Sequence, residues 1–367
     1  MNAAHQAWMA EALRQANRGL YTTHPNPRVG CVIVHQDEQI ASGWHEFAGG
    51  PHAEANALRA AEIPVGADFY ITLEPCSHHG RTPPCVDAVI EARPARVIVA
   101  MQDPNPEISG RGLEKLRVQT IEVVTGILEN EARELNRGFV KRMEQGLPYV
   151  SVKMATSLDG RTALANGESQ WITGEAARRD VQFQRARASA ILSSAQTVID
   201  DDPSLNVRLT SEALGQRRTV HQPVRVVVDS QGRLTGQERI FSIDGDIWVY
   251  SLNAESYGAK RLRDAGAQVI AVQAEGEHIS LNAMLRDLAT RGINEVHSEC
   301  GAELSGALIQ QGVVDQIILY QAPHLLGNRA RGAFDLGEIE SMTQRKNCKI
   351  QDMRQLGDDL RLTLRLE

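Results

Sequence analysis

Four side chains in the first hundred residues could build a hydrolytic metal site. His52 and Glu54 lie in the run P-H-A-E at 51–54, while Cys76 ends E-P-C at 74–76 and Cys85 ends T-P-P-C at 82–85. One imidazole and two thiolates are ligand types that zinc prefers. Three protein ligands leave the fourth coordination position for water, so these residues predict a catalytic zinc site.

Glu54 has the position expected of a proton shuttle. It follows His52 by two residues, which is too close for a fourth zinc ligand but allows it to reach a water on the metal. Zinc lowers the pKa of that water, and the resulting hydroxide can attack a ring carbon that bears an amino group. Glu54 would then carry the proton to the leaving ammonia. H-x-E followed by P-C is typical of zinc deaminases, although eight residues separate these cysteines where C-x-x-C is usual.

A closed, structural zinc site is the main alternative. Cys31, His78 or His79 could supply a fourth ligand, and the metal would then only stabilise the fold. A single histidine or cysteine is also more often a packing residue than a ligand. The placement of Glu54 favours the catalytic interpretation.

Longer strings of residues extend the pattern along the chain. The first part contains H-P-N-P-R-V-G-C-V at 24–32, L-E-P-C-S-H-H-G-R-T-P-P-C at 73–85 and D-P-N-P at 103–106. The second contains S-V-K-M-A-T-S-L-D-G-R-T-A at 151–163, S-Q-W-I-T-G at 169–174, D-D-P-S-L-N-V-R at 201–208 and Y-Q-A-P-H-L-L-G at 320–327. In these strings, including the long cysteine spacing, the chain resembles the bifunctional deaminase/reductase family of riboflavin biosynthesis.

This resemblance implies a fold and two reactions. The fold class is α/β, with an N-terminal cytidine-deaminase-like α/β/α domain and a C-terminal dihydrofolate-reductase-like α/β domain. The first domain would use Zn²⁺ to remove the 2-amino group of 2,5-diamino-6-ribosylamino-4(3H)-pyrimidinone 5′-phosphate. The second would use NADPH to reduce the ribosyl side chain of the product to a ribityl chain. A zinc deaminase of another nucleobase-like substrate, with a second domain that only binds or assembles, is the alternative.

The resemblance also assigns the binding residues. Asn26 would contact the substrate near the zinc, and two further sets lie in the second domain. The NADPH site would comprise Ala155, Trp171, Thr197, Asp201, Ser230 and Gly301, and the substrate site Lys153, Ser169, Arg185, Leu205, Arg208 and Glu299. Arginine suits a phosphate because guanidinium presents paired donors to its oxygens. No G-x-G-x-x-G follows a strand, so spacing alone would not predict a dinucleotide site.

One turn departs from the family pattern. E-C-G-A-E stands at 299–303 where a glycine-rich turn is expected. Gly301 and Gly306 would flank the start of the next helix, where amide groups can face a pyrophosphate. We expect Cys300 to restrict this turn, because only glycine adopts a positive φ easily.

Two domains must position these residues. A chain of 367 residues is long for one core, and G-L-P at 146–148 precedes a new strand, so we expect domains at 1–146 and 147–367. Helices are predicted at 1–20, 52–62, 84–92, 129–142, 174–188, 279–291 and 302–311. Strands are predicted at 29–34, 68–73, 96–101, 121–125, 149–155, 190–193, 224–229, 246–251, 268–272, 295–299 and 315–321, with a hairpin around Gly357.

Composition restricts the partners. The net charge of −7 provides no basic field for nucleic acid, whereas a small phosphorylated pyrimidine needs only a few local cations. No apolar run approaches a membrane span, and the N-terminal segment reads as an amphipathic helix instead of a leader. Five cysteines are an odd number for a disulfide framework. We expect a cytoplasmic protein with no membrane partner, and a homo-oligomer, either a dimer or a tetramer.

Overall fold

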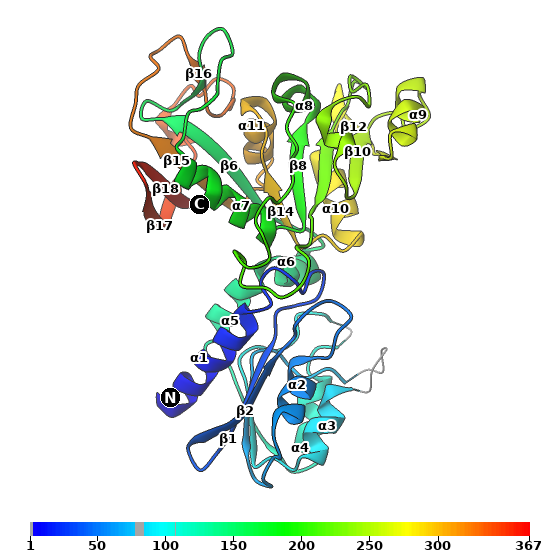
Figure 1. Cartoon of the computed structure of the whole chain (residues 1–367), viewed down its shortest axis with the longest axis vertical. Helices are drawn as coiled ribbons and strands as arrows, with labels where there is room; N and C mark the ends of the chain where they lie inside the picture. The colour runs from blue at the N-terminus through cyan, green and yellow to red at the C-terminus, as the bar shows by residue number, and fades with distance from the viewer. Residues whose placement is uncertain (1–2, 78–83, 107) are drawn as a thin grey trace. The chain divides into compact units, whose positions relative to one another are not determined.

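The chain forms two compact units in the computed structural model, which describes residues 3–77, 84–106 and 108–367 (Figure 1). The first unit comprises Met1–Gly146 and the second Leu147–Glu367. Gly146 has a φ of 66° and ends the last helix of the first unit in the left-handed conformation, which glycine adopts at little cost.

The first unit is built on a five-stranded sheet. Its strands are β1 (Gly30–His35), β2 (Glu38–Trp44), β3 (Asp68–Ile71), β4 (Arg96–Val99) and β5 (Glu122–Thr125), in the order β2-β1-β3-β4-β5. β1 is antiparallel to both neighbours, and β3, β4 and β5 are parallel. Gln36 and Asp37 form the tight β1–β2 turn, with φ of 51° and 60°.

Helices cover both faces of this sheet. They are α1 (Ala3–Asn17), α2 (Ala53–Ala60), α3 (Cys85–Glu91), α4 (Arg111–Val118), α5 (Glu129–Leu135) and α6 (Arg137–Gln145). Successive β1 side chains point to opposite faces. Ile33 packs in a cluster with α2, α3 and α4, whereas Val32 packs with α1, α5 and α6. The result is the α/β/α layering that the resemblance implied.

One prediction for this unit needs correction, and two elements were missed. The helix predicted at 129–142 is two helices, α5 and α6, which meet at Asn136. The Asn136 side chain accepts a hydrogen bond from the Arg28 backbone N–H at 2.7 Å and donates one to the Arg28 carbonyl at 2.9 Å. These two hydrogen bonds between Asn136 and Arg28 fix the point at which α5 ends and α6 begins. β2 and α4 were not predicted.

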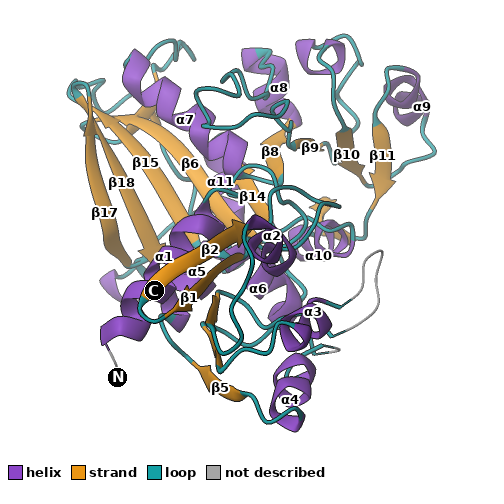
Figure 2. Ribbon diagram, turned by 60° about the horizontal axis from the view of Figure 1, so that its bottom comes forward, coloured by secondary structure: helices purple, strands orange, loops and turns teal. Residues whose placement is uncertain are grey.

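The second unit contains a nine-stranded sheet. Its strand order is β11-β10-β9-β8-β14-β6-β15-β18-β17. The strands are β6 (Tyr149–Ser157), β8 (Ala190–Ser194), β9 (Val224–Val228), β10 (Ile247–Ser251), β11 (Gln268–Ala271), β14 (Glu295–Ser298), β15 (Gln316–Ala322), β17 (Cys348–Leu356) and β18 (Asp359–Leu366). Seven strands are parallel, and the terminal β17–β18 hairpin is antiparallel and turns at Gly357, as predicted (Figure 2).

Helices and small ladders complete the second unit. The helices are α7 (Glu175–Arg187), α8 (Ala195–Asp201), α9 (Tyr257–Asp264), α10 (Leu281–Thr290) and α11 (Ala302–Gln310), and the short strands are β7 (Arg161–Ala163), β12 (Ala274–Glu275), β13 (His278–Ile279) and β16 (Arg331–Gly332). α8 and α9 were not predicted. The carboxyl ends of parallel strands share one edge of a sheet, which is where ligands bind in open α/β folds.

The C-terminal hairpin is tied to α7. Arg361 of β18 donates two hydrogen bonds, both of 3.0 Å, to the carboxylate of Asp180 in the middle of α7. The Asp359 carboxylate accepts a bond of 2.7 Å from the N–H of Gly174, directly before α7. The hairpin therefore fixes both the start and the middle of that helix. Among the described residues, no helix is both long and apolar enough to cross a membrane.

Candidate active sites

The first candidate site is a group of three metal-binding side chains in the first unit. His52 Nδ1 lies 3.0 Å from Cys85 Sγ and 3.5 Å from Cys76 Sγ. The ligand atoms of all three residues lie within 4.8 Å of one another. The structure thus brings together the three side chains that the sequence analysis selected.

Two helix starts and one loop position this group. His52 directly precedes α2, and Cys85 is the first residue of α3. Cys76 lies after β3, and its sulfur accepts a hydrogen bond of 3.3 Å from the Cys85 backbone N–H. The amino end of a helix carries partial positive charge, so the start of α3 favours a thiolate at Cys76.

The two thiols differ strongly in acidity. The pKa of Cys76 is lowered to about 4, first because it is hydrogen-bonded to the Cys85 side chain and second because it is bonded to His52. The pKa of Cys85 is raised by the same contact with Cys76. The bond to Cys76 also raises the pKa of His52. A thiolate is the form that coordinates zinc, so Cys76 is already disposed toward a cation, whereas Cys85 would have to release its proton when a metal binds.

The donor set fits a zinc ion with an open position. Among the described residues, His52, Cys76 and Cys85 form the one group of candidate ligands, and Cys31 is not part of it. Cys31 is fully buried in β1, where burial raises its pKa well above the ordinary value. His78 and His79, the other fourth ligands considered, lie outside the described residues. One nitrogen and two sulfurs match an open zinc site.

Glu54 lies in the first turn of α2, beside this group. Its side chain is buried, with 3% exposed, and it contacts Cys85. Burial raises the pKa of Glu54 to about 7. A carboxyl with a pKa near neutrality can both accept and release a proton, as a shuttle must.

Asn26 reaches the same region through a histidine that the sequence analysis did not select. The Asn26 side-chain amide lies 3.1 Å from His45 Nε2, and His45 Nδ1 lies 3.0 Å from the Pro51 carbonyl oxygen. The ring of His45 packs edge-on against His52, with 5.5 Å between the centroids. His45 occurs in no metal-like spacing, so only its position after β2 could have indicated a role.

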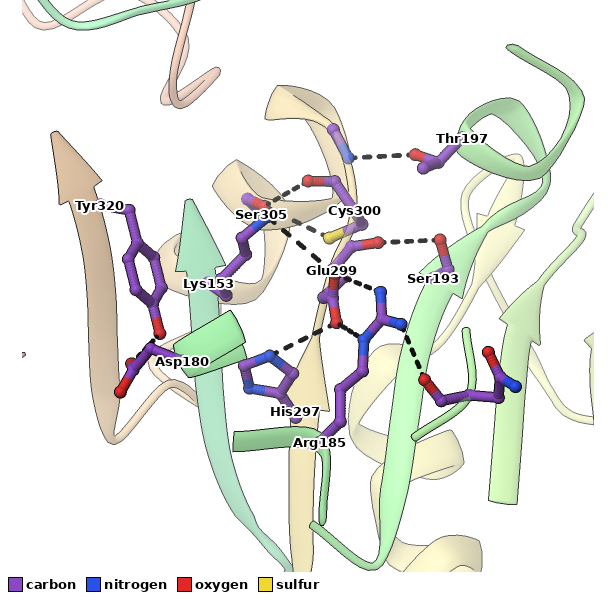
Figure 3. Close-up of polar contacts among 12 residues, drawn as sticks. Lys153, Asp180, Arg185, Ser193, Thr197, His297, Glu299, Cys300, Ser305 and Tyr320 are labelled. Carbon is purple, nitrogen blue, oxygen red and sulfur yellow. Dashed lines mark hydrogen bonds and ion pairs between the residues drawn. The ribbon is translucent and has the colours of Figure 1, made fainter. Parts of the chain in front are cut away.

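The second candidate site centres on Glu299, directly after β14 (Figure 3). Arg185 of α7 binds this carboxylate with two hydrogen bonds, of 2.5 Å from Nε and 3.0 Å from a terminal nitrogen. Lys153 Nζ of β6 lies 4.0 Å from it and His297 Nε2 of β14 lies 3.5 Å from it. Burial alone would raise the pKa of Glu299, but Arg185 and Lys153 hold it well below its usual range. Glu299 is therefore a buried carboxylate anion.

The remaining charged residues of the predicted set lie around this cluster. Arg208 is exposed, and its backbone N–H donates to the Gln182 side chain at 2.9 Å. Desolvation and the nearby Arg185 lower the pKa of Arg208. Desolvation and Asp200 raise the pKa of Asp201, while Lys153 opposes the shift. Lys153 thus acts electrostatically on both Asp201 and Glu299.

The predicted cofactor residues lie on several elements. The Gly301 N–H, at the start of α11, donates to Thr197 Oγ1 of α8 at 3.2 Å. Ser230, after β9, accepts a bond of 3.2 Å from the Ile279 N–H. Trp171 is 70% exposed and lies under the Arg178 guanidinium, and Ala155 is half-buried in β6. Thr197 and Gly301 are in direct contact, whereas no such contact joins Trp171 to them among the described residues.

Two residues of the predicted substrate set lie in different surroundings. Leu205 is buried in the core cluster that includes Ile191 and Val227, with 2% exposed and a φ of 45°. Ser169 is half-buried in the segment before α7. Leu205 therefore packs in the core of the second unit.

The expectation for the turn after β14 needs correction. Gly301 has a φ of −70°, and Cys300 is not among the described residues with positive φ, so Cys300 imposes no backbone strain. Gly306 is buried inside α11, where an added Cβ would lie 1.7 Å from the Asp335 carbonyl oxygen. Gly306 therefore allows α11 to pack closely against the backbone of Asp335, and its role is not to bind an anion. The Cys300 sulfur lies 3.0 Å from Ser298 Oγ and 3.2 Å from Ser305 Oγ.

Other buried groups near Glu299 were missed. Burial lowers the pKa of His297 to about 4, so its ring is neutral. The hydroxyl of Tyr320, on β15, donates to Asp180 at 2.6 Å. Tyr320 and Asp180 lie 140 residues apart along the chain, so no local spacing could have indicated this pair. His297 lies two residues before Glu299, but an isolated histidine in a buried strand gives no sign of a role.

The two units match two different family models. Residues 2–101 match the cytidine and deoxycytidylate deaminase zinc-binding region. Residues 148–362 match the RibD C-terminal domain. The protein is therefore, by class, a zinc-dependent deaminase joined to a reductase.

Relatives extend the match to nearly the whole chain. The riboflavin biosynthesis protein RibD of Escherichia coli is 47% identical over 97% of this chain and 98% of its own length. The RibD of Haemophilus influenzae is 45% identical over 97% of this chain and 96% of its own. The chain belongs to the RibD family.

Solved structures agree. Acinetobacter baumannii RibD, form 1, has a TM-score of 0.92 at 45% identity and covers 99% of both chains. A diaminohydroxyphosphoribosylaminopyrimidine deaminase/5-amino-6-(5-phosphoribosylamino)uracil reductase of Thermotoga maritima has a TM-score of 0.87 at 31% identity, again over 99% of both chains. The protein thus carries deaminase and reductase activities of riboflavin biosynthesis, with Zn²⁺ and NADPH as cofactors, and the alternative of a second domain without catalysis is disfavoured.

Proposed function

We propose that the first unit deaminates 2,5-diamino-6-ribosylamino-4(3H)-pyrimidinone 5′-phosphate and that the second reduces the ribosyl group of the product. The buried Glu54 beside the open group of His52, Cys76 and Cys85 is the observation that carries the first half. A small phosphorylated substrate also suits a chain with a net charge of −7, which has no basic field for nucleic acid.

In the deaminase, His52, Cys76 and Cys85 would hold the metal. Zinc, when bound, supplies a Lewis acid that activates water for attack. Glu54 accepts a proton from the attacking water and delivers it to the amino nitrogen as ammonia leaves. A carbon–oxygen bond replaces the carbon–nitrogen bond, and one water is consumed for each ammonia released. Asn26, fixed by His45, would orient the pyrimidine.

In the reductase, Thr197, Gly301, Ser230, Asp201, Ala155 and Trp171 would hold NADPH. NADPH, when bound, would supply the hydride that reduces the ribosyl carbon bonded to nitrogen, and the bond from this carbon to the ring oxygen would break. That oxygen would gain a proton, and Lys153, whose Nζ lies 4.0 Å from the Glu299 carboxylate, is the donor that we propose. The Glu299 carboxylate can accept hydrogen bonds from ribose hydroxyl groups.

The phosphate-binding roles in the second unit differ between the two arginines. Arg185 already donates two bonds to Glu299 and one of 2.9 Å to the Asn206 carbonyl. We therefore infer that Arg185 acts on the substrate mainly through Glu299, whose carboxylate it orients. The exposed Arg208 has a guanidinium that can take the phosphate, while Ser169 and Leu205 would complete the substrate site.

The test is a coupled assay with the diaminopyrimidinone ribosyl phosphate. We expect ammonia release without NADPH, and NADPH oxidation only after deamination. Glu54→Gln should lower both signals with this substrate by about 10²- to 10⁴-fold but still oxidise NADPH at the wild-type rate when the deaminated aminouracil is supplied. NADPH oxidation at the wild-type rate by Glu54→Gln with the diamino compound would contradict the order of reactions.

We also infer a cytoplasmic location and assembly into a dimer or a tetramer. None of the five cysteines is joined in a disulfide, which supports a reducing compartment. Light scattering on the purified protein tests the assembly, and a monomer at micromolar concentration would contradict it.

A further inference from the structure

Arginines follow the carboxyl ends of β9 and β10, at the sheet edge where the cofactor is expected. They are Arg233 and Arg239 after β9, and Arg261 and Arg263 on α9 after β10. Because a NADPH molecule carries a phosphate on the adenosine ribose in addition to its pyrophosphate, an arginine at this edge has an obvious anionic partner. The surroundings of the four guanidinium groups decide which one is available.

Three of these arginines are already engaged. Arg239 forms an ion pair of 3.5 Å with Asp202, and Arg263 forms one of 3.1 Å with Glu255. Arg261 lies over the ring of Tyr257 and donates to a backbone carbonyl.

Arg233, like Arg261, forms no ion pair with a carboxylate in the described part of the chain, but unlike Arg261 it does not lie over an aromatic ring. It is instead held by a neutral amide: one terminal nitrogen donates to Gln196 Oε1 at 2.6 Å. The Arg233 backbone N–H also donates to Asp229 at 2.9 Å, which fixes the loop. The charge of this arginine is oriented but not neutralised.

The contact with Gln196 ties Arg233 to α8, the helix that also contacts the expected pyrophosphate position. Gln196 directly precedes Thr197 in α8, and Thr197 Oγ1 accepts the bond from the Gly301 N–H at the start of α11 (Figure 3). A helix start favours a phosphate through its free amides and partial positive charge. Arg233 is thus linked to the start of α11 through α8, which contacts both of them.

Strand order gives the direction in which the cofactor must extend. The order β9-β8-β14-β6 places the reactive cluster of Lys153 and Glu299 at one side and the loop of Arg233 at the other. α11 follows β14, between them (Figure 2). Three strand spacings amount to roughly 14 Å, which suits the span of an extended dinucleotide. With the nicotinamide near Lys153, the adenosine end lies toward β9.

We propose that Arg233 binds the 2′-phosphate of NADPH and sets the preference of the reductase for NADPH over NADH. Guanidinium donates paired hydrogen bonds to phosphate oxygens, and the hydroxyl of NADH at that position offers no charge to pair. This inference rests on the proposed function of the second unit.

The first test is binding, measured by calorimetry on the full chain with adenosine 2′,5′-bisphosphate and with 5′-AMP. Arg233→Ala should weaken the bisphosphate about tenfold or more and leave 5′-AMP unchanged. Arg233→Lys should recover part of the loss. Arg239→Ala removes a neighbouring but paired cation and is the matched control, with both affinities unchanged. Equal weakening of both ligands by Arg233→Ala, or equal effects of the two alanine variants, would overturn the proposal.

The second test is steady-state reduction of the aminouracil substrate. Arg233→Ala should raise the KM for NADPH about tenfold or more with little change in the KM for NADH. A thermal melt of each variant checks that the unit is folded. If the wild-type chain fails to bind NADPH, the proposed function itself is wrong; if it binds NADPH and Arg233→Ala binds it equally well, only the role of Arg233 is wrong.

Discussion

The two active sites are built in opposite ways. The zinc site takes its residues from 34 consecutive positions, 52–85, and from the starts of two neighbouring helices. The site around Glu299 takes Lys153 from β6, Arg185 from α7 and Glu299 from after β14, and 114 residues separate Arg185 from Glu299. The first depends on short stretches of chain, whereas the second depends on the strand order of a large sheet. Substitutions should therefore separate the two activities cleanly.

The largest expected effect is loss of the metal. Cys76→Ser or Cys85→Ser removes one of three protein ligands, so we expect zinc to be lost and ammonia release to be abolished. Reduction of the aminouracil should continue, because its residues lie in the other unit. Metal analysis with Cys348→Ser, an exposed cysteine outside the site, is the control. Full zinc occupancy in either variant would refute the ligand assignment.

Next in size is the proton shuttle. Glu54→Gln should retain zinc but lower the rate of ammonia release by about 10²- to 10⁴-fold, the usual contribution of a positioned acid and base. Zinc content and deamination rate are measured on the same sample. Loss of zinc along with activity would show that Glu54 is a ligand and not a shuttle.

A smaller effect is expected in the second unit. Arg208→Ala should raise the KM for the phosphorylated aminouracil by roughly tenfold to a hundredfold, because one charge-assisted contact is lost. The affinity for NADPH should not change, and Arg217→Ala, an exposed arginine nearby in sequence, should behave as wild type. An equal loss for substrate and cofactor would count against the assignment.

The smallest effect is a dependence of stability on acid pH. Against the opposing effect of burial, Arg185 and Lys153 hold the pKa of Glu299 below its unfolded value of about 4.3. The Glu299 ion pair therefore contributes stability above that pH, and the contribution falls as pH decreases toward the folded pKa. Thermal melts between pH 7 and 3 should show a weaker acid dependence in Glu299→Gln than in wild type. Identical slopes would mean that this carboxylate does not contribute.

The same contrast explains what could be predicted from the sequence. The sequence was enough to predict the candidate zinc site, because residue types at this spacing are typical of zinc deaminases. Its residues are His52, Glu54, Cys76 and Cys85. Most strands were found from their apolar runs, but β2 is half-exposed and α8 and α9 are short, so their patterns are weak.

The network around Glu299 could be predicted only through family resemblance. The Tyr320–Asp180 pair had no local indication, because it joins a strand and a helix 140 residues apart along the chain. His45 and His297 were missed because neither lies in a spacing typical of a site, although each contacts a residue that is closer in sequence.

The hairpin of β17 and β18 also has a consequence for biosynthesis on the ribosome. Asp359 and Arg361, a few residues from the end of the chain, hold the start and middle of α7, the helix that carries Arg185. While translation proceeds, the first unit can fold as soon as it emerges, since all its strands are encoded by then. The second unit must wait until this hairpin has been synthesised. A nascent chain stalled before the hairpin would thus carry a folded first unit and an unfinished second unit.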